Sequence, residues 1–321
     1  MKKVLITTLA IITIFITVTC SKKPSPASPS APAPGWSQAA ASAGFSGRYW
    51  HSSLVYNNAM WVIGGLTASG WAGDVWSSTN GAAWTEATGT ATFGPRSGQT
   101  SLVYNNKMWV IGGYDAGYVY NDVYSSTDGI TWPQATGAAL FPARYDHRSV
   151  VYNNLMWVIA GTNGTIYISD IWNSGDGITW TEVTGTAGFT PRGDFSSVVY
   201  NNFMWVISGT PDSYTELSDV WYSSDGRNWT ESTSAPAFGA RAGQSSVVYN
   251  NEMWVIGGYS TAGFQNDAWS SNNGVLWVED TASAAYSPRM DQTSVVYNNE
   301  MWVIAGLGNN TDYYNDVWRL Q

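Results

Sequence analysis

The chain contains a single cysteine among 321 residues, and charged side chains are scarce. Because Cys20 stands alone, neither a disulfide nor a cysteine-based metal site can form within one chain. The two histidines, His51 and His147, lie two repeats apart with no third ligand evident, so we expect no metal. No phosphate-binding loop and no HExxH or CxxC motif occurs, and we expect no cofactor.

Positive charge is especially rare. Lys and Arg number 14 against 23 Asp and Glu, which gives a formal net charge of −9. Such a chain offers no basic patch from which nucleic acid could release counterions, and anionic lipid would repel it. We therefore expect no binding to nucleic acid, and contact with a membrane only through a covalent lipid.

Aromatic residues and glycine are abundant, with 19 Trp, 19 Tyr and 33 Gly. Hydrophobic residues make up 44% of the sequence, enough for a large core. The length suits one repetitive all-β domain or two ordinary domains.

The N-terminus has the pattern of an export signal. Lys2 and Lys3 precede an apolar run from Val4 to Thr19, which ends directly before Cys20. This arrangement resembles the bacterial lipoprotein signal, although Thr17 and Thr19 depart from its preferred residues. The resemblance implies a signal peptide over residues 1–19 and lipidation of Cys20. A plain signal peptide or an uncleaved membrane anchor remains the alternative.

Residues 20–35 alternate Pro, Ser and Ala without an apolar pattern, which is typical of a semi-extended tether. The domain that follows is therefore expected to be exported and held at the cell envelope. A lipoprotein of the outer membrane, facing the periplasm or the outside, is the location that we favour.

Residues 36–321 form a repeat array. The motif VYNNxMWVI starts at Val55, Val103, Val151, Val199, Val248 and Val296, at intervals of 48 or 49 residues. Each unit predicts four short strands: one before the Asn-Asn pair, the apolar segment after it, a third around Asp74 and a fourth around Trp84. Asn-Asn suits a two-residue type I′ hairpin turn, since Asn tolerates positive φ. Four antiparallel strands per period are typical of a propeller blade.

The spacing of repeated residues predicts six blades and a closed ring. The fourth-strand Trp follows the third-strand Asp by ten residues in five units, but the sixth, after Asp316, would fall beyond Gln321. Trp36 precedes Arg48 by twelve residues, as Trp84 precedes Arg96. We therefore expect Trp36 to supply the missing strand, so that the N-terminal segment completes the last blade and leaves no open edge.

The same residues resemble the kelch motif. The motif has an Arg that opens the first strand, a Gly pair such as Gly64-Gly65 that ends the second, and aromatic residues such as Trp76 and Trp84 in the outer strands. The resemblance implies a six-bladed kelch propeller. It says little about function, because kelch propellers serve both as binding modules and as enzymes.

Among the repeat units, the number of residues varies only between the second-strand Gly and the third-strand Asp. The sequence of this segment also differs in every unit. The face that carries these segments, together with the fourth-to-first-strand connections, is the predicted functional face. Trp50 and Trp71 are the two Trp outside the repeat pattern, and both belong to the predicted functional face. Exposed Trp or Tyr could stack on a sugar ring or a partner side chain, or fold down as packing residues.

The residues after each repeated Arg should line the mouth of the central channel. The arginines themselves could bridge to a neighbouring blade's Asp or to backbone carbonyls, or form a cationic collar for a carboxylate ligand. The candidate binding residues are Trp50, His51, Trp71, Arg96, Gln99, Tyr118, Arg144, Asp146, His147, Arg192, Asp194, Tyr214, Arg241, Arg289 and Asp291.

Two functions of different class remain open. The first is a monomeric binding module for a glycan or a protein, and we prefer it to an enzyme because no catalytic residue can be assigned. The second is a sugar-modifying enzyme similar to the bacterial kelch sialic acid mutarotases (N-acetylneuraminate epimerases). Convergence of Arg with Asp or His at the mouth would distinguish them. A structural envelope protein without a small ligand is a third possibility.

Overall fold

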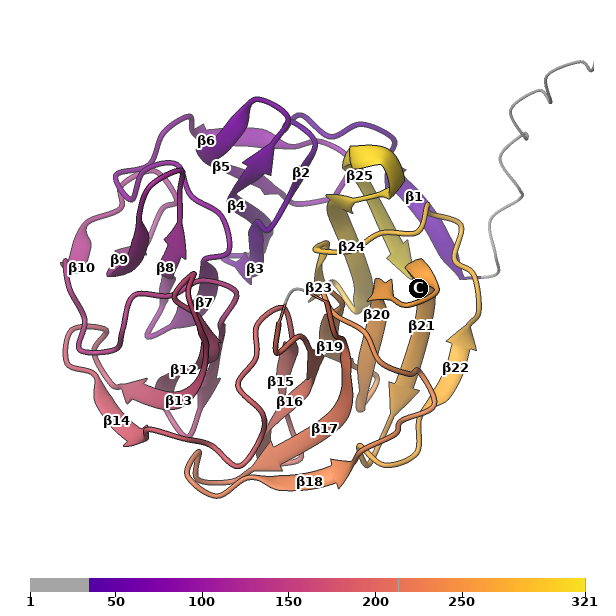
Figure 1. Cartoon of the computed structure of the whole chain (residues 1–321). Helices are drawn as coiled ribbons and strands as arrows, with labels where there is room; N and C mark the ends of the chain where they lie inside the picture. The colour runs from indigo at the N-terminus through magenta and orange to yellow at the C-terminus, as the bar shows by residue number, and fades with distance from the viewer. Residues whose placement is uncertain (1–34, 213, 321) are drawn as a thin grey trace, which may run out of the picture. The chain divides into compact units, whose positions relative to one another are not determined.

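The computed structural model describes residues 35–212 and 214–320, which form six antiparallel sheets around a central axis (Figure 1). The prediction of an all-β propeller with six blades is confirmed. Among the described residues, no helix is long and apolar enough to cross a membrane. The proposed signal peptide, the lipidation site Cys20 and nearly all of the tether lie outside the described residues.

The first three blades follow one another in the chain. Blade 1 contains β2 (Arg48–Tyr49), β3 (Ser52–Tyr56), β4 (Ala59–Thr67), β5 (Gly70–Ser78) and β6 (Thr85–Thr88). Blade 2 contains β7 (Thr100–Tyr104), β8 (Lys107–Tyr114), β9 (Val119–Ser126) and β10 (Gln134–Thr136). Blade 3 contains β11 (Arg148–Tyr152), β12 (Leu155–Thr162), β13 (Tyr167–Ser174) and β14 (Thr181–Thr184).

The remaining blades complete the circle. Blade 4 contains β15 (Ser196–Tyr200), β16 (Phe203–Gly209), β17 (Leu217–Ser223) and β18 (Thr230–Thr233). Blade 5 contains β19 (Ser245–Tyr249), β20 (Glu252–Ser260), β21 (Gly263–Ser271) and β22 (Val278–Thr281). Blade 6 contains β23 (Thr293–Tyr297), β24 (Glu300–Leu307), β25 (Tyr313–Leu320) and β1 (Trp36–Ala40), with the short 3₁₀ helix η1 (Asn309–Thr311) before β25.

The inner edge of each blade begins at the repeated Arg and is then interrupted. In blade 1, β2 pairs with the far end of β4, Arg48 opposite Thr67, and β3 pairs with the rest of β4. In the other blades a single bridge takes the place of β2, as between Ser97 and Tyr114. The interruption falls on the residues that follow the Arg, and these form the mouth of the channel.

The Asn-Asn pairs make the hairpins that the sequence predicts. All twelve Asn residues have φ between 47° and 62°, the left-handed conformation that a type I′ turn requires at both positions. The second strands that follow are buried almost throughout, as their apolar text predicts.

The Gly pair that ends each second strand forms a bulge with two different demands. Its first residue has φ of 53–60°, which Ala160, Ser208 and Ala305 also adopt. Its second residue has φ of 99–113°, a region open to Gly alone. A Cβ on Gly65 would also lie 2.7 Å from the Cβ of His51. The second Gly is therefore present in every blade, whereas the first is not.

The residues that repeat most strictly join each blade to the next. In blade 1, the hydroxyl of Tyr56 donates to the carbonyl of Asn106 in the hairpin of blade 2, at 2.8 Å. The ring of Trp61 lies over Gly129 in the turn between β9 and β10, where a Cβ would come within 2.1 Å of the ring. The copied segment is thus a contact surface between blades, which explains why it changes so little.

The N-terminal strand closes the ring, as predicted. β1 pairs with β25 in an antiparallel ladder that places Trp36 opposite Leu320. Trp36 is 1% exposed and meets the Tyr286 ring edge-on at 5.1 Å. On the inner side, Tyr297 of blade 6 donates to the carbonyl of Asn58 in blade 1. Figure 1 shows β1 on the outer side of β25.

In blades 1 and 5 the variable segments are largely strand rather than loop. β5 begins at Gly70 instead of near Asp74, and it pairs with β4 as far as Thr67. These hairpins between the second and third strands project on the same face as the residues that follow each Arg, since both contribute to one cavity there. The predicted functional face is thus built from hairpin arms around a central depression.

Candidate functional site

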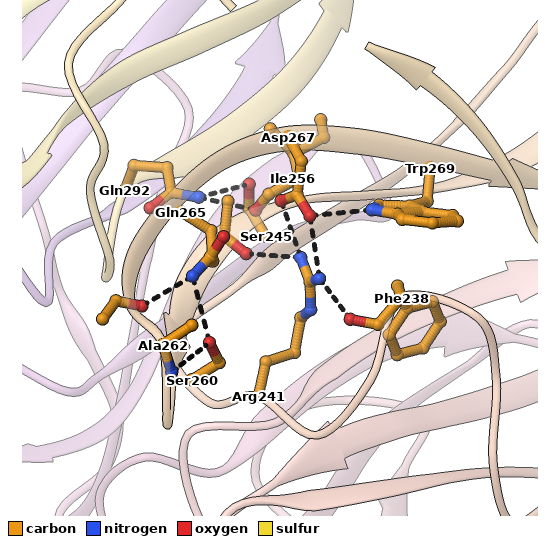
Figure 2. A network of polar contacts seen from close by, with 12 residues as sticks. Phe238, Arg241, Ser245, Ile256, Ser260, Ala262, Gln265, Asp267, Trp269 and Gln292 are labelled. Atoms are coloured by element: carbon orange, nitrogen blue, oxygen red, sulfur yellow. Dashed lines mark hydrogen bonds and ion pairs between the residues drawn. The ribbon is translucent and has the colours of Figure 1, made fainter. Parts of the chain in front are cut away.

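The repeated arginines lie inside the blades rather than at the mouth. Arg48 donates to both carboxylate oxygens of Asp74, at 2.7 and 2.8 Å, and to the carbonyl of Gly64 at 2.8 Å. Figure 2 shows the same arrangement in blade 5, where Arg241 binds Asp267. The other four pairs, closed at 2.6–2.7 Å, are Arg96–Asp122, Arg144–Asp170, Arg192–Asp219 and Arg289–Asp316.

This geometry decides among the expectations about the arginines: they donate to backbone carbonyls, as one alternative had it, and two others are wrong. Each is at most 2% exposed and binds the Asp of its own blade, not that of a neighbouring blade. A phenyl or phenol ring beside each guanidinium, such as Phe45 at 5.3 Å from Arg48, completes its burial. They form no cationic collar, so the candidates Arg96, Arg144, Arg192, Arg241 and Arg289 are structural.

The third residue after each Arg connects neighbouring blades. Gln292 donates from Nε2 to the carbonyl of Ile256 in the preceding blade, at 2.7 Å (Figure 2). Gln99 makes the equivalent contact with Ile63, and Nε2 of His147 lies 3.0 Å from Oγ1 of Thr100. These side chains therefore belong to the scaffold between blades.

Both histidines are held in the neutral form. Burial, reinforced by the positive charge of Arg48, lowers the pKa of His51 to about 3. Burial also lowers the pKa of His147 well below its usual value. Burial thus disfavours the charged form of both candidate site residues.

The second residue after each Arg forms a ring of six with one backbone conformation. All have φ of 49–65°, the left-handed region, and they are Trp50, Gly98, Asp146, Asp194, Gly243 and Asp291. Backbone hydrogen bonds link several neighbours around this ring, for example from the amide of Asp146 to the carbonyl of Gly98 at 3.0 Å. A left-handed Trp is unusual, because a bulky side chain is strained there.

The two glycines of this ring make room for carboxylates. A Cβ on Gly98 would lie 2.9 Å from Oδ1 of Asp146, and one on Gly243 would lie 2.7 Å from Oδ1 of Asp291. Each of these Asp side chains therefore leans over the Gly of the preceding blade. The order Gly then Asp occurs in blades 2 and 3 and again in blades 5 and 6, on opposite sides of the channel.

The three carboxyl groups are enclosed and incompletely bonded. Asp146 is 5% exposed and Asp291 is 7% exposed. Neither oxygen of Asp291 accepts a hydrogen bond from any residue that the structure describes, and the same holds for Oδ1 of Asp194. Burial and the negative charge of Asp194 raise the pKa of Asp291 well above its usual range. Burial and the other two carboxyls do the same to Asp146.

Arg148 is the one Arg or Lys at the described channel wall. It takes a place that is Ser or Thr in the other blades, at Ser52, Thr100, Ser196, Ser245 and Thr293. Its guanidinium donates to the carbonyl of His147 and lies 5.7 Å from the Phe195 ring. Its positive charge opposes the rise in pKa of all three carboxyls. Among the described contacts, Arg148 forms no ion pair with any of them.

The mouth opens into a cavity of about 460 Å³. Its charged lining residues are all acidic: Asp146, Asp194, Asp212, Glu216 and Asp291. Its aromatic lining residues are Trp50, Tyr114, Tyr145, Tyr167, Tyr214, Tyr259 and Phe264. Below it lies a narrower channel cavity of about 160 Å³, lined mainly by Ser and Thr, and Trp50 and Asp291 border both.

The aromatic candidates divide between this cavity and the rim. Trp50 and Trp71 are half-buried, and both meet the ring of Tyr114 edge-on, at 5.9 and 6.1 Å. Trp71 does not line the cavity itself. Tyr214 lines it while remaining 92% exposed, whereas Tyr118, 71% exposed, lies outside it.

Tyr114 and Tyr145 were not among the candidate binding residues, although Tyr114 opens one of the variable segments. Their rings lie 4.3 Å apart and link blade 2 to blade 3 along the cavity wall. A signal was available, because Tyr114 directly follows the Gly pair and Tyr145 directly follows the repeated Arg. Both positions vary among the blades, beside an Arg and a Gly that do not change.

The described residues contain no group of three or more His, Cys, Asp or Glu side chains that could hold a metal ion. The three mouth carboxyls, from blades 3, 4 and 6, are therefore spread around the ring. The cavity can take an uncharged or positively charged organic group, with aromatic rings from five blades and acidic side chains in its lining.

Comparison with known proteins supports the fold. The family model for the KLHDC2/KLHL20/DRC7 kelch-repeats domain matches residues 34–186 and residues 176–321. The solved structure of YjhT is similar, with a TM-score of 0.72 and 16% identity over 87% of this chain and 95% of that chain. A search of curated proteins found no match.

Proposed function

The chain belongs to the kelch-repeat family, and from this premise we propose that it is a binding module whose ligand enters the mouth cavity. One observation carries the proposal: a cavity of about 460 Å³ combines an aromatic wall with buried carboxyl oxygens that accept no hydrogen bond from the described residues. Cavities of about 300–1,000 Å³ suit small organic ligands, and a few placed polar groups in them fix orientation.

A carbohydrate is the ligand class that we propose. The flat face of a Tyr or Trp packs on the C–H surface of a sugar ring, while carboxylate oxygens accept its hydroxyl hydrogens. Trp50 and Tyr214 supply such rings, and Asp291 supplies free acceptors. An acidic sugar suits this cavity poorly, because every charged residue that lines it is acidic.

A sugar-modifying enzyme, similar to the bacterial kelch sialic acid mutarotases, is the second candidate. It is favoured by the unequal carboxyls at the mouth. Burial and the charges of Asp194 and Asp291 raise the pKa of Asp146, while Arg148 is the main influence that opposes burial at Asp194. Carboxyls with separated pKa values can divide the roles of proton donor and acceptor. Its substrate would be a neutral sugar rather than an acidic one.

We also propose that residues 1–19 direct export and that Cys20 carries a lipid at the cell envelope. The charged start, the apolar run and the position of the lone Cys support this. Mass spectrometry of the mature protein tests it: a chain that begins at a diacylated Cys20 is expected. An unmodified Cys20, or a chain that retains residues 1–19, would contradict the proposal.

Titration of the domain from Gly35 with a panel of neutral sugars tests the main proposal. For a sugar that binds, Tyr214→Ala and Trp50→Ala should each weaken the affinity about tenfold or more, because each removes a stacking surface. Tyr118→Ala is the matched control, since Tyr118 is exposed on the same face outside the cavity. It should leave the affinity unchanged.

The proposal fails if no sugar binds, or if Tyr118→Ala weakens binding as much as Tyr214→Ala does. Following the anomers of the bound sugar by NMR separates the two candidates. Faster exchange between anomers with the protein present, lost in Asp146→Asn, would favour the enzyme. An unchanged exchange rate would favour the binding module.

A further inference from the structure

The charges around the mouth cavity are not balanced. Five acidic residues line it, and no Lys, Arg or His does so among the described residues. Arg148, in the channel below, is the single guanidinium whose charge acts on the three mouth carboxyls. The titratable groups that line the mouth cavity or the channel, or act on its carboxyls, are Asp146, Asp194, Asp291, Asp212, Glu216, Arg148, His51, Tyr49, Tyr114, Tyr145, Tyr167, Tyr214 and Tyr259.

Asp291 is the residue that points to a ligand. It is only 7% exposed, and it lines both cavities. Neither of its carboxyl oxygens accepts a hydrogen bond at bonding geometry from the described residues. A buried carboxylate normally has partners, because an unpaired one is costly. The left-handed backbone at Asp291 directs its side chain over Gly243, where the missing Cβ leaves room for the carboxyl group.

The indole of Trp50 has a related position. Its Nε1–H has no hydrogen-bond acceptor at bonding geometry among the described residues, although it faces Asp194 and Asp291 closely enough to lower the pKa of both. Trp50, Asp194 and Asp291 all line the mouth cavity, so a ligand bound there lies beside all three.

A metal ion does not fit this arrangement, because the carboxyls do not gather into a cluster of metal ligands among the described residues. An organic cation fits it better. An ammonium group has three donors for acceptors spread around it, and aromatic faces attract cations through their ring quadrupole. The cavity has seven aromatic residues around its acidic base.

We propose that the mouth cavity recognises a protonated amine, so that its preferred ligand is an amino sugar rather than a neutral one. Asp291 and Asp194 accept the ammonium hydrogens, and the rings of Trp50 and its neighbours contact the sugar. This proposal rests on the proposed function, because it names the ligand class of the same cavity.

Ligand binding should then be coupled to protons. In the free protein, burial raises the pKa of Asp291 and Asp146 above the ordinary range of a carboxyl group. A bound ammonium favours the ionised form, so binding releases protons and strengthens as pH rises. The trend reverses only where the ligand's own amine loses its proton.

Calorimetric titration with three matched sugars tests the proposal: glucosamine, N-acetylglucosamine and glucose, with choline as a cation without a sugar ring. At pH 7, glucosamine should bind about tenfold or more tightly than the other two sugars. Titration in two buffers of different ionisation enthalpy should show proton release for glucosamine. Asp291→Asn should remove the preference, whereas Asp115→Asn, an acidic residue on the same face outside the cavity, should not.

Each outcome decides something distinct. Equal affinity for glucose and glucosamine, with no effect of Asp291→Asn in a folded variant, overturns the amine proposal and leaves the proposed function standing. Binding of choline as tight as that of glucosamine keeps the amine and overturns the sugar. Failure of all four compounds overturns the amine proposal, and the proposed function falls with it only if no sugar of the neutral panel binds either. Thermal unfolding of each variant confirms that it is folded.

Discussion

At the scale of the residue, one position in each blade decides what the mouth can do. Two residues after the repeated Arg, the backbone is left-handed in all six blades. Gly and Asp are the residues that occupy this region at low cost, whereas Trp50 is strained there. Of the three Asp at this position, Asp146 and Asp291 are buried and Asp194 is half-buried, all with few partners, which reduces stability in the free protein. Sites of binding often carry such a cost.

Replacing Asp291 by Asn should therefore stabilise the free protein at neutral pH. Asn keeps the shape and tolerates the left-handed backbone, and it removes a buried charge. We expect a gain of about 1–3 kcal/mol in the free energy of unfolding at pH 7.

The gain should vanish at low pH. Because the folded pKa of Asp291 is raised, its carboxyl destabilises the fold only above its ordinary unfolded pKa. Below about pH 4 both states hold the proton, and wild type and variant should unfold alike. Urea denaturation of both proteins from pH 4 to 8 measures the difference. An equal gain at every pH would contradict the assignment.

The arginines show how a sequence interpretation can count correctly and still misplace residues. Six Arg and six Asp were both recognised, and Asp122 follows Arg96 by 26 residues much as its counterparts do in every blade. Their pairing within one blade depends on where the third strand returns, which spacing alone does not fix. Because this pairing places every repeated Arg inside a blade, the charged residues that remain at the mouth are acidic, and spacing alone does not reveal this.

Arg144→Ala should destabilise the protein by about 3–5 kcal/mol, since it leaves Asp170 as a buried charge without its partner. Arg319→Ala is the matched control: Arg319 pairs with Glu300 at 3.3 Å and its side chain is 37% exposed. That loss should stay below about 1 kcal/mol. Chemical denaturation of both variants makes the comparison, and similar losses would mean that the Arg144 pair is not structurally important.

At the scale of the element, the hairpins and second strands could be predicted because local chemistry determines them. Asn tolerates positive φ, and an apolar run of this length suits a buried strand. The start of β5 at Gly70 could not be predicted, since the variable segment pairs as an extended hairpin only through its contacts with β4. The cavity wall was missed for a similar reason: Tyr114 and Tyr145 meet across two blades.

The bulge at the end of each second strand gives a prediction from adjacent residues. Gly209→Ala should cost about 3 kcal/mol or more, because φ is 104° and the new Cβ would lie 2.6 Å from that of Phe195. Ser208→Gly should change stability by less than about 1 kcal/mol, since φ of 55° suits Gly and a buried unbonded hydroxyl is removed. Thermal unfolding compares the two; a reversed order would contradict this account of the Gly pair.

At the scale of the whole molecule, the architecture was predictable from arithmetic on the repeats. Five fourth-strand Trp residues and a sixth at Trp36 were enough to place β1 in blade 6, and its pairing with β25 confirms this. The ligand was not predictable at this scale, because the repeats describe what the blades share and the mouth depends on where they differ.

Closure by β1 can be tested with two chains that differ by one strand. A chain that starts at Gly35 keeps β1, whereas one that starts at Ala41 lacks it. Loss of the buried Trp36 alone should cost about 3–5 kcal/mol, so we expect the melting temperature to fall by about 10 °C or more. The exposed edge of β25 should also promote association, which size-exclusion chromatography detects. Equal melting temperatures would show that the ring does not depend on this strand.

The pairing of β1 with β25 also has a consequence for the order of folding. The edges of β5, β9, β13, β17 and β21 each meet a fourth strand that follows within a short stretch of chain. β25 has no such successor, and its partner β1 is the first strand of the domain to be synthesised. Contacts between segments so distant in sequence form late, because the intervening chain must first be ordered. The pairing of β1, the first strand to be synthesised, with β25, the last, therefore forms late. The propeller becomes complete only after its final residues have left the ribosome.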